Sequence, residues 1–403
     1  MTRQGGSVSA GETADCRHLP AAAQRRLAHA LVAAALRGGV PAYPRDPPPE
    51  LPAHILALSA VHGVEALLAA ALATAAAATS WPVALRERLR AITHAQAARE
   101  LLIQHELDRL LPALAAAGVR FLLFKGTPLA YALYPHPYQR ARGDTDLLIP
   151  PSDRGRAEAV LLGAGYRTAA TAGGDLAAYE RTYSKTDHAG VEHHLDLHWQ
   201  LSNSQIFARA FGFAALATAA VPVPALGPHA RMPHPVHGLL IACLHRVTHL
   251  HAPYVVDGVP YREANRLIWL YDIHRLAHRL SPDDWDGLVA LASAKGLRAL
   301  CLDGLTATQR TLGTAIPASL PGRLAAPCRA GAHGGGCTGR RCHGSAGWRS
   351  SPASSPAWWW GHPCRRRRGG VWRGRSCWCW WAPWMIAIAW APAGGCWPRS
   401  ARG

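Results

Sequence analysis

The sequence predicts an α+β fold in which a small mixed β-sheet core lies between N-terminal and C-terminal helical regions and is followed by a disordered tail. Three observations support this. Residues 20–117 are rich in Ala and Leu at helical spacing, and helical spacing returns over 204–320. Residues 118–203 instead contain short apolar and alternating runs typical of strands. The last segment, 321–403, shows neither period.

The N-terminal region is predicted to begin after a disordered stretch over 1–19. A helix over 20–37 should end at the glycine pair that follows it, and a second helix is predicted over 53–78. Ser80 is the candidate N-cap of a long helix that ends before Gly118.

The core begins where the period changes. Strands are predicted at 119–124, 144–149, 166–170, 177–185 and 191–199, with helices at 127–134 and 152–164, the latter capped by Ser152, and a hairpin turn at 187–190. Further helices are predicted near 204–215, 235–251, 262–280, 283–294 and 296–313.

Charge and cysteine are concentrated in the tail. Residues 327–403 contain no Asp, Glu or Lys but 12 Arg, 11 of the 15 Trp and 7 of the 10 Cys, which leaves residues 1–326 only +6 of the formal +18. We therefore expect neither nucleic acid nor a membrane as a partner of the main body. The three remaining cysteines, Cys16, Cys243 and Cys301, form no disulfide or zinc pattern, and the N-terminus lacks an apolar leader, so a cytoplasmic location is expected.

The tail itself is nearly confined to residues with GC-rich codons. Our interpretation is a frameshift that begins near 321–330, which would make 321–403 an aberrant low-complexity segment. Two alternatives remain: a nucleic-acid patch at Arg365–Arg368, and a membrane span over 377–397, which Pro383 and Pro392 argue against.

The strand at 144–149 carries a pair of acids. Asp144 and Asp146 are two residues apart and therefore point to the same face, whereas Thr145 and Leu147 point to the other. Two adjacent carboxylates are costly unless a cation neutralises them, and oxygen ligands favour Mg²⁺ or Mn²⁺.

The strand at 191–199 has one apolar face and one polar face. The polar face carries Glu192, His194, Asp196 and His198. Asp196 can supply a third carboxylate if this strand pairs beside 144–149. His194 and His198 flank Asp196 and are either metal ligands or acid/base groups, or else they orient their neighbours or stay partly solvated; we favour the second pair of interpretations.

Upstream, a Lys-Gly-Thr sequence joins a buried strand to a short helix. Gly126 permits close approach of the backbone to a ligand, and Thr127 places a hydroxyl at a helix N-terminus, which favours phosphate. Lys125 and Arg142 are nearby cations.

These motifs, taken in order, resemble the bacterial uncharacterised nucleotidyltransferase family of the DNA polymerase beta-type superfamily. The resemblance covers about 100–313. The matching elements are Lys125-Gly126, a helix with Tyr131 and Tyr134, Arg142, the run DTDLL at 144–148, the run DLHW at 196–199, and in the helical part His245, His249 and the run LIWLYDI at 267–273. Two features depart from the superfamily's usual pattern: a Gly-Thr in place of Gly-Ser, and a longer spacing from Gly126 to Asp144, which does suit this branch.

The resemblance implies metal-dependent transfer of a nucleoside monophosphate from an NTP to an unknown small-molecule or protein acceptor, with Mg²⁺ or Mn²⁺ as cofactor. The alternative is a non-catalytic module that keeps the fold and binds nucleotide or protein. The implied metal-binding and catalytic residues are Asp144, Asp146 and Asp196, and the implied nucleotide-binding residues are Lys125, Gly126, Thr127 and Arg142. His245 and His249 lie one helical turn apart, and we interpret them as structural.

Overall fold

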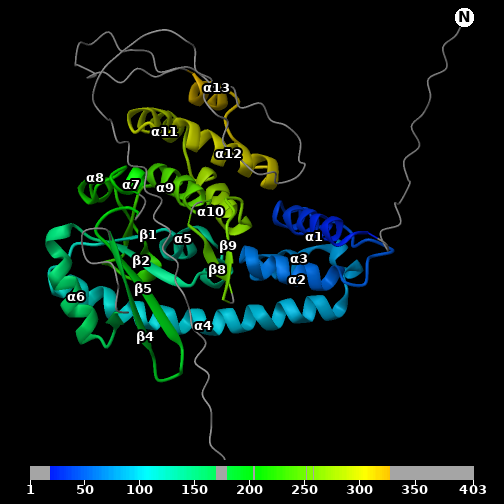
Figure 1. Cartoon of the computed structure of the whole chain (residues 1–403), viewed down its shortest axis with the longest axis horizontal. Helices are drawn as coiled ribbons and strands as arrows, with labels where there is room; N and C mark the ends of the chain where they lie inside the picture. The colour runs from blue at the N-terminus through cyan, green and yellow to red at the C-terminus, as the bar shows by residue number, and fades with distance from the viewer. Residues whose placement is uncertain (1–18, 169–178, 203–204, 251, 257, 327–403) are drawn as a thin grey trace, which may run out of the picture. The chain divides into compact units, whose positions relative to one another are not determined.

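The α+β fold predicted from the sequence is confirmed (Figure 1). The computed structural model describes residues 19–168, 179–202, 205–250, 252–256 and 258–326, which fall within one compact unit, Met1–Gly331. The predictions for 1–18, for the strand ends at 169–170 and 177–178, and for the tail after residue 326 lie outside the described residues. The region boundaries at 20–117, 118–203 and 204–320 stay predictions.

The N-terminal helices are α1 (Ala21–Leu36), α2 (Leu51–His62), α3 (Glu65–Thr74) and α4 (Val83–Ala116). The single helix predicted over 53–78 is wrong, because Gly63 takes a left-handed conformation with φ +65° and separates α2 from α3. Ser80 is not the cap of α4. It ends a 3₁₀ helix (Ala76–Ser80), and its hydroxyl donates to the Ala77 carbonyl and accepts from the Tyr43 amide.

The main sheet has five strands, which are β1 (Leu122–Phe124), β2 (Asp144–Leu148), β3 (Arg167–Thr168), β4 (Glu180–Thr186) and β5 (Glu192–His198). Their order in the sheet is β1-β2-β5-β4-β3. Strand β2 pairs with β1 in antiparallel and with β5 in parallel orientation, so the sheet is mixed. The 187–190 turn between β4 and β5 is confirmed by the hydrogen bond from the Gly190 amide to the Asp187 carbonyl.

Helix α4 runs along the core and is tied to it by ion pairs. Glu106 of α4 pairs with Lys185 of β4 at 2.8 Å. Helix α5 (Gly126–Leu133) directly follows β1, and α6 (Arg154–Gly163) follows a 3₁₀ helix (Pro151–Asp153). The predicted cap Ser152 lies inside that 3₁₀ helix and does not cap α6.

The C-terminal region is mainly helical. These are α7 (Gln205–Ala208), α8 (Phe213–Thr218), α9 (Pro235–Thr248), α10 (Leu267–Ala277), α11 (Pro282–Ala294), α12 (Arg298–Leu312) and α13 (Leu320–Ala325). Two hairpins, β6–β7 (Val221–Pro222 and Arg231–Met232) and β8–β9 (Tyr254–Val256 and Val259–Tyr261), were not predicted.

The C-terminal helices differ from their predicted bounds in three places. Helix α10 starts at Leu267 rather than near 262, because residues 262–266 form the irregular connection from the hairpin β8–β9 to the helix. The helix predicted over 204–215 is two short ones. Helix α13 lies in the region interpreted as tail, where the buried Leu320 and Leu324, one turn apart, pack it onto the core.

Within the part of the chain that the structure describes, no helix is both long and apolar enough to cross a bilayer. The cytoplasmic location stays a prediction.

Candidate functional site

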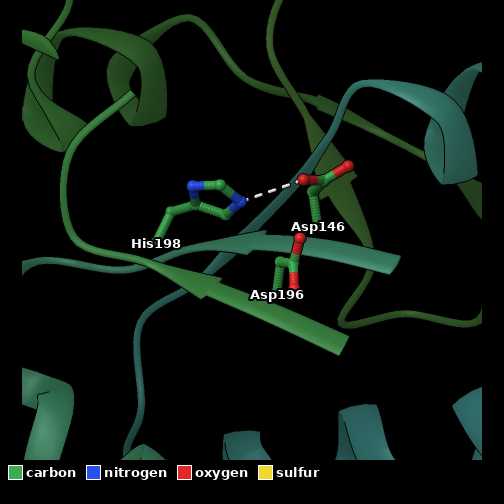
Figure 2. Close-up of side chains that lie close together, drawn as sticks. All are labelled: Asp146, Asp196 and His198. Carbon is green, nitrogen blue, oxygen red and sulfur yellow. Dashed lines mark hydrogen bonds and ion pairs between the residues drawn. The ribbon is translucent and has the colours of Figure 1, made fainter. Parts of the chain in front are cut away.

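The parallel pairing of β2 with β5 brings two of the predicted carboxylates together. Asp146 lies directly opposite Asp196 in the register. Both side chains rise from the same side of the two strands, and His198, two residues after Asp196, turns its ring toward Asp146 (Figure 2). This face was expected from the alternation of β5, whose apolar Leu195 and Leu197 are buried on the other side.

Asp146 is the most strongly held of the acids. It is 3% exposed, and its Oδ1 accepts from Lys125 Nζ at 2.6 Å and from His198 Nε2 at 2.9 Å. Burial alone would raise its pKa, but the charges of Lys125 and His198 outweigh burial and hold the pKa of Asp146 below its usual range. Asp146 is therefore ionised at neutral pH.

His198 is fully buried and engages carboxylates through both ring nitrogens. Its Nε2 faces Asp146, and its Nδ1 lies 2.9 Å from Glu180 Oε2 as an ion-pair contact. Burial and Lys125 oppose protonation, but Asp146 and Glu180 together raise the pKa of His198 above its ordinary value. The hydrogen bond from Nε2 places His198 to orient Asp146. Its role, as an orienting group or as a metal ligand, stays a prediction, because its ring also lies within the group of ligand atoms that it forms with Asp146 and Asp196.

Asp196 and Asp144 have less neighbouring positive charge than Asp146 has. Asp196 accepts a hydrogen bond from Thr182 at 2.6 Å, yet its burial and then the charge of Asp146 raise its pKa. Asp144 lies at the exposed start of β2. Loss of surrounding water and the neighbouring Asp146 raise the pKa of Asp144, although solvent at its exposed position screens that effect.

This donor set fits a divalent cation. One ligand atom each from Asp146, Asp196 and His198 all lie within 4.8 Å of one another. Among the described residues, the basic side chains that contact these carboxylates are Lys125 and His198, and both contact Asp146. Burial, and after it the charge of Asp146, raise the pKa of Asp144 and Asp196, and a metal ion bound there would supply opposing positive charge.

Lys125 stands at a strained backbone position. It is the one non-glycine residue among those described with a positive φ, +58°, and it precedes the first turn of α5. Such a conformation costs an L-residue about 1–3 kcal/mol and is typical of functional sites. It turns the lysine back over β2, where its Nζ reaches Asp146.

Gly126 is required by its neighbour. A Cβ at this position would lie 3.3 Å from the Arg140 guanidinium, so the absence of a side chain lets Arg140 pack under the loop. Gly126 is itself buried, and the close approach that its missing side chain permits here is that of Arg140. The close approach of a ligand to its backbone stays a prediction.

Thr127 and Arg142 lie behind this loop. Thr127 is fully buried, and its hydroxyl donates to the Asp144 carbonyl and accepts from Arg142 Nε at 3.1 Å. The Arg142 side chain is 3% exposed and forms a two-pronged ion pair with Glu100 of α4, which also accepts from the Tyr131 hydroxyl. Both residues touch the site from its supporting side.

The sequence analysis missed a buried network behind Gly126. Arg140 binds Asp272 of α10 through Nε and Nη2, the shorter contact being 2.7 Å, and the Tyr134 hydroxyl donates to Asp272 Oδ1 at 2.7 Å. All three side chains are buried. A signal was present, because Asp272 is the one acid within the apolar run LIWLYDI.

Two clefts meet at the carboxylates. The first cleft, about 600 Å³, lies between the loop at Lys125 and a wall formed by Tyr254, Arg266 and Trp269. The second cleft, about 580 Å³, lies between Asp196 and the side chains of Phe207 and Leu244. The residues that line both clefts are Lys125, Asp144, His245 and His249.

Comparison with known proteins gives a family match. The model of a family described as an uncharacterised nucleotidyltransferase matches residues 48–313, a range that includes both clefts. A search of curated proteins finds no match.

Proposed function

We propose that this chain, which belongs to the uncharacterised nucleotidyltransferase family, moves a nucleoside monophosphate from an NTP to an acceptor in a reaction that needs a divalent metal ion. The observation that carries the proposal is the pairing of Asp146 with Asp196 across two parallel strands, beside the Lys125-Gly126 loop. Ligand atoms of Asp146, Asp196 and His198 lie within 4.8 Å of one another there, and Asp144 stands two residues before Asp146 at the exposed start of the same strand.

The metal ion, Mg²⁺ or Mn²⁺, would be held by Asp144, Asp146 and Asp196. When bound, it supplies charge neutralisation of the phosphates. Oxygen donors suit both ions. His198 is placed to hold one oxygen of Asp146, so that the other oxygen of that carboxylate stays available.

The rest of the chemistry belongs to side chains of this chain. Lys125 and the backbone of Gly126 and Thr127 contact the phosphates, and Arg142 holds the loop through Thr127. Asp196 accepts the proton of the acceptor hydroxyl. The acceptor oxygen bonds to the α-phosphorus as the bond from that phosphorus to its bridging oxygen breaks, and pyrophosphate leaves.

Calorimetric titration of the four NTPs into the full-length chain, with and without Mg²⁺, tests the proposal. Metal-dependent binding is expected in the wild type and should be lost in Asp146→Asn. Glu192→Gln is the matched control, since Glu192 is exposed on the same polar face of β5 and contacts His194 instead of the site. A folded wild-type protein that binds no NTP contradicts the proposal.

An NTP labelled at the α-phosphate then separates an enzyme from a binding module. Label retained on a product while pyrophosphate is released shows transfer. Metal-dependent binding without any transfer to a broad set of hydroxyl-bearing acceptors favours the non-catalytic alternative.

A further inference from the structure

The two clefts open onto the same carboxylates but have different linings. The first cleft is lined by three arginines and Trp269, and by the carboxylates Glu65, Asp144 and Asp146. Two of the arginines, Arg140 and Arg142, already pair with Asp272 and Glu100, which leaves Arg266 as the arginine of this cleft that forms no ion pair with a described residue. The second is mainly apolar away from its acidic edge, and no arginine lines it among the described residues. This difference bears on where each substrate binds.

The far wall of the first cleft is a stack of flat groups. His249 stacks on Trp269 with ring centroids 4.5 Å apart and an interplanar angle of 17°, and Tyr254 meets Trp269 edge-on at 5.0 Å. The Arg266 guanidinium lies 4.8 Å from the centre of the Tyr254 ring. We call Tyr254, Arg266 and Trp269 the aromatic wall. It is built where the hairpin β8–β9 lies beside α10 (Figure 1).

Arg266 is held in this wall by a backbone contact, and the carboxylates Glu65 and Glu263 lie near enough to act on its charge. Its Nε donates to the Val61 carbonyl at 2.7 Å, and it forms no ion pair with any residue in the described ranges. Gly63 makes room for it, because a Cβ there would lie 3.3 Å from Arg266 Nη2. Tyr254 and Trp269 are only 8% and 4% exposed, so Arg266 and the ring edges that reach the cleft are the groups on which a base can stack.

The second cleft is bounded by helices α7 and α9. Its apolar side chains are Leu201, Phe207, Ile241, Leu244 and Ala252, and its acidic edge is Glu180 and Asp196. Its one cation, Lys125, is shared with the first cleft and already pairs with Asp146. A triphosphate would meet carboxylates there with no further basic group to oppose them.

We propose that the clefts divide the substrates: the nucleotide binds in the first cleft with its base against the aromatic wall, and the second cleft is left to the acceptor. This rests on the proposed function. When the phosphates bind at the Lys125-Gly126 loop, the base lies on the side of the aromatic wall. The acceptor then approaches Asp196 from the opposite side, through the second cleft. Each cleft has the size of a small-molecule site.

The test compares an NTP with inorganic tripolyphosphate, which has the phosphates but no base. Both are titrated with Mg²⁺ into the full-length wild type and into Trp269→Leu and Tyr254→Leu. Loss of one stacking partner should weaken NTP binding about tenfold or more, while tripolyphosphate binding stays unchanged. Tyr254→Phe keeps the ring and removes only the hydrogen bond to Glu263, so it should bind NTP as the wild type does.

Phe207→Ala provides the matched control, because it removes an aromatic ring from the second cleft. It should leave NTP affinity unchanged. If Trp269→Leu fails to fold, as judged by circular dichroism, Tyr254→Leu decides alone.

Two results overturn the division of substrates while leaving nucleotide binding intact. One is a wild type that binds NTP and tripolyphosphate equally well, and the other is a Phe207→Ala protein weakened as much as Tyr254→Leu. If neither NTP nor tripolyphosphate binds to a folded wild type, the proposed function itself fails, and this inference falls with it.

Discussion

The buried network of Arg140, Asp272 and Tyr134 should be the most sensitive point of the described structure outside its apolar core. We consider the change Asp272→Asn. It keeps the size of the side chain but removes the charge that pairs with Arg140. The Arg140 and Asp272 side chains are only 7% and 5% exposed, so water cannot replace the lost partner.

The loss of folding free energy follows from the unpaired Arg140 charge that remains buried after the substitution. Removing one member of a buried ion pair leaves an uncompensated charge and typically costs about 3–5 kcal/mol of folding free energy. Tyr134→Phe removes one hydrogen bond to a charged group, at 2.7 Å, and should cost about 1.5–3 kcal/mol. Because both changes act on the same carboxylate, their effects should not add in the double variant.

Urea unfolding of the full-length chain, followed by circular dichroism, measures these losses. The matched control is Asp286→Asn, which breaks the exposed pair of Asp286 with Arg323, where the side chains are 68% and 39% exposed. That control should lose no more than about 1 kcal/mol.

The double variant Arg140→Met with Asp272→Leu completes the series. It removes both charges together and should recover part of the loss seen in Asp272→Asn. An Asp272→Asn protein as stable as the Asp286→Asn control, or a double variant that loses the full sum of its single changes, would refute the reasoning.

Three further predictions concern single positions near the clefts. Lys125→Gly should be more stable than Lys125→Ala by about 1 kcal/mol in urea unfolding, because both lose the contact with Asp146 but only glycine relieves the positive φ of +58°; equal stabilities would show that the position is unstrained. Burial, then the charges of His29 and Arg266, lowers the pKa of His62 from 6.5 to about 3. Between these values the unfolded chain binds a proton that the folded chain does not, so stability is fully present above pH 6.5 and falls as pH drops toward 3. His62→Gln should bind up to one proton fewer on unfolding in this pH range, so its free energy of unfolding should depend less steeply on pH. A slope of unfolding free energy against pH equal to that of the wild type would contradict the lowered pKa of His62. Gly63→Ala should destabilise by about 1 kcal/mol or more, since alanine must adopt φ +65° with its Cβ 3.3 Å from Arg266 Nη2; a thermal melting midpoint equal to the wild type's would refute this.

The elements of the core could be predicted because their signals are local. The alternation in β5 assigns Asp196 and His198 to a polar face whatever the strand pairs with, and Asp144 and Asp146 share a face for the same reason. The predictions of helix N-caps were less accurate. Ser80 and Ser152 have the residue type of an N-cap, but both belong to 3₁₀ turns that follow from the packing around them.

Roles of the basic residues could not be predicted in the same way. Arg140 and Arg142 are two residues apart and chemically identical, and the chain between α5 and β2 carries no period that tells them apart. Arg142 turns to Glu100 of the N-terminal region and Arg140 to Asp272 of the C-terminal region. Each choice depends on a partner 42 or 132 residues away.

The sequence by itself determined the fold class, the order of the core elements and the face on which the carboxylates lie, because backbone periodicity fixes which neighbouring side chains share a face. Only the tertiary structure decided that β2 and β5 are parallel neighbours with Asp146 opposite Asp196, that His198 bridges Asp146 and Glu180, and that Tyr254, Arg266 and Trp269 form a wall across from Lys125. These are contacts between distant segments. Such contacts form when the elements pack together and bring buried charges and apolar faces of distant segments against one another. A local sequence pattern carries no information about which distant segment will be in contact.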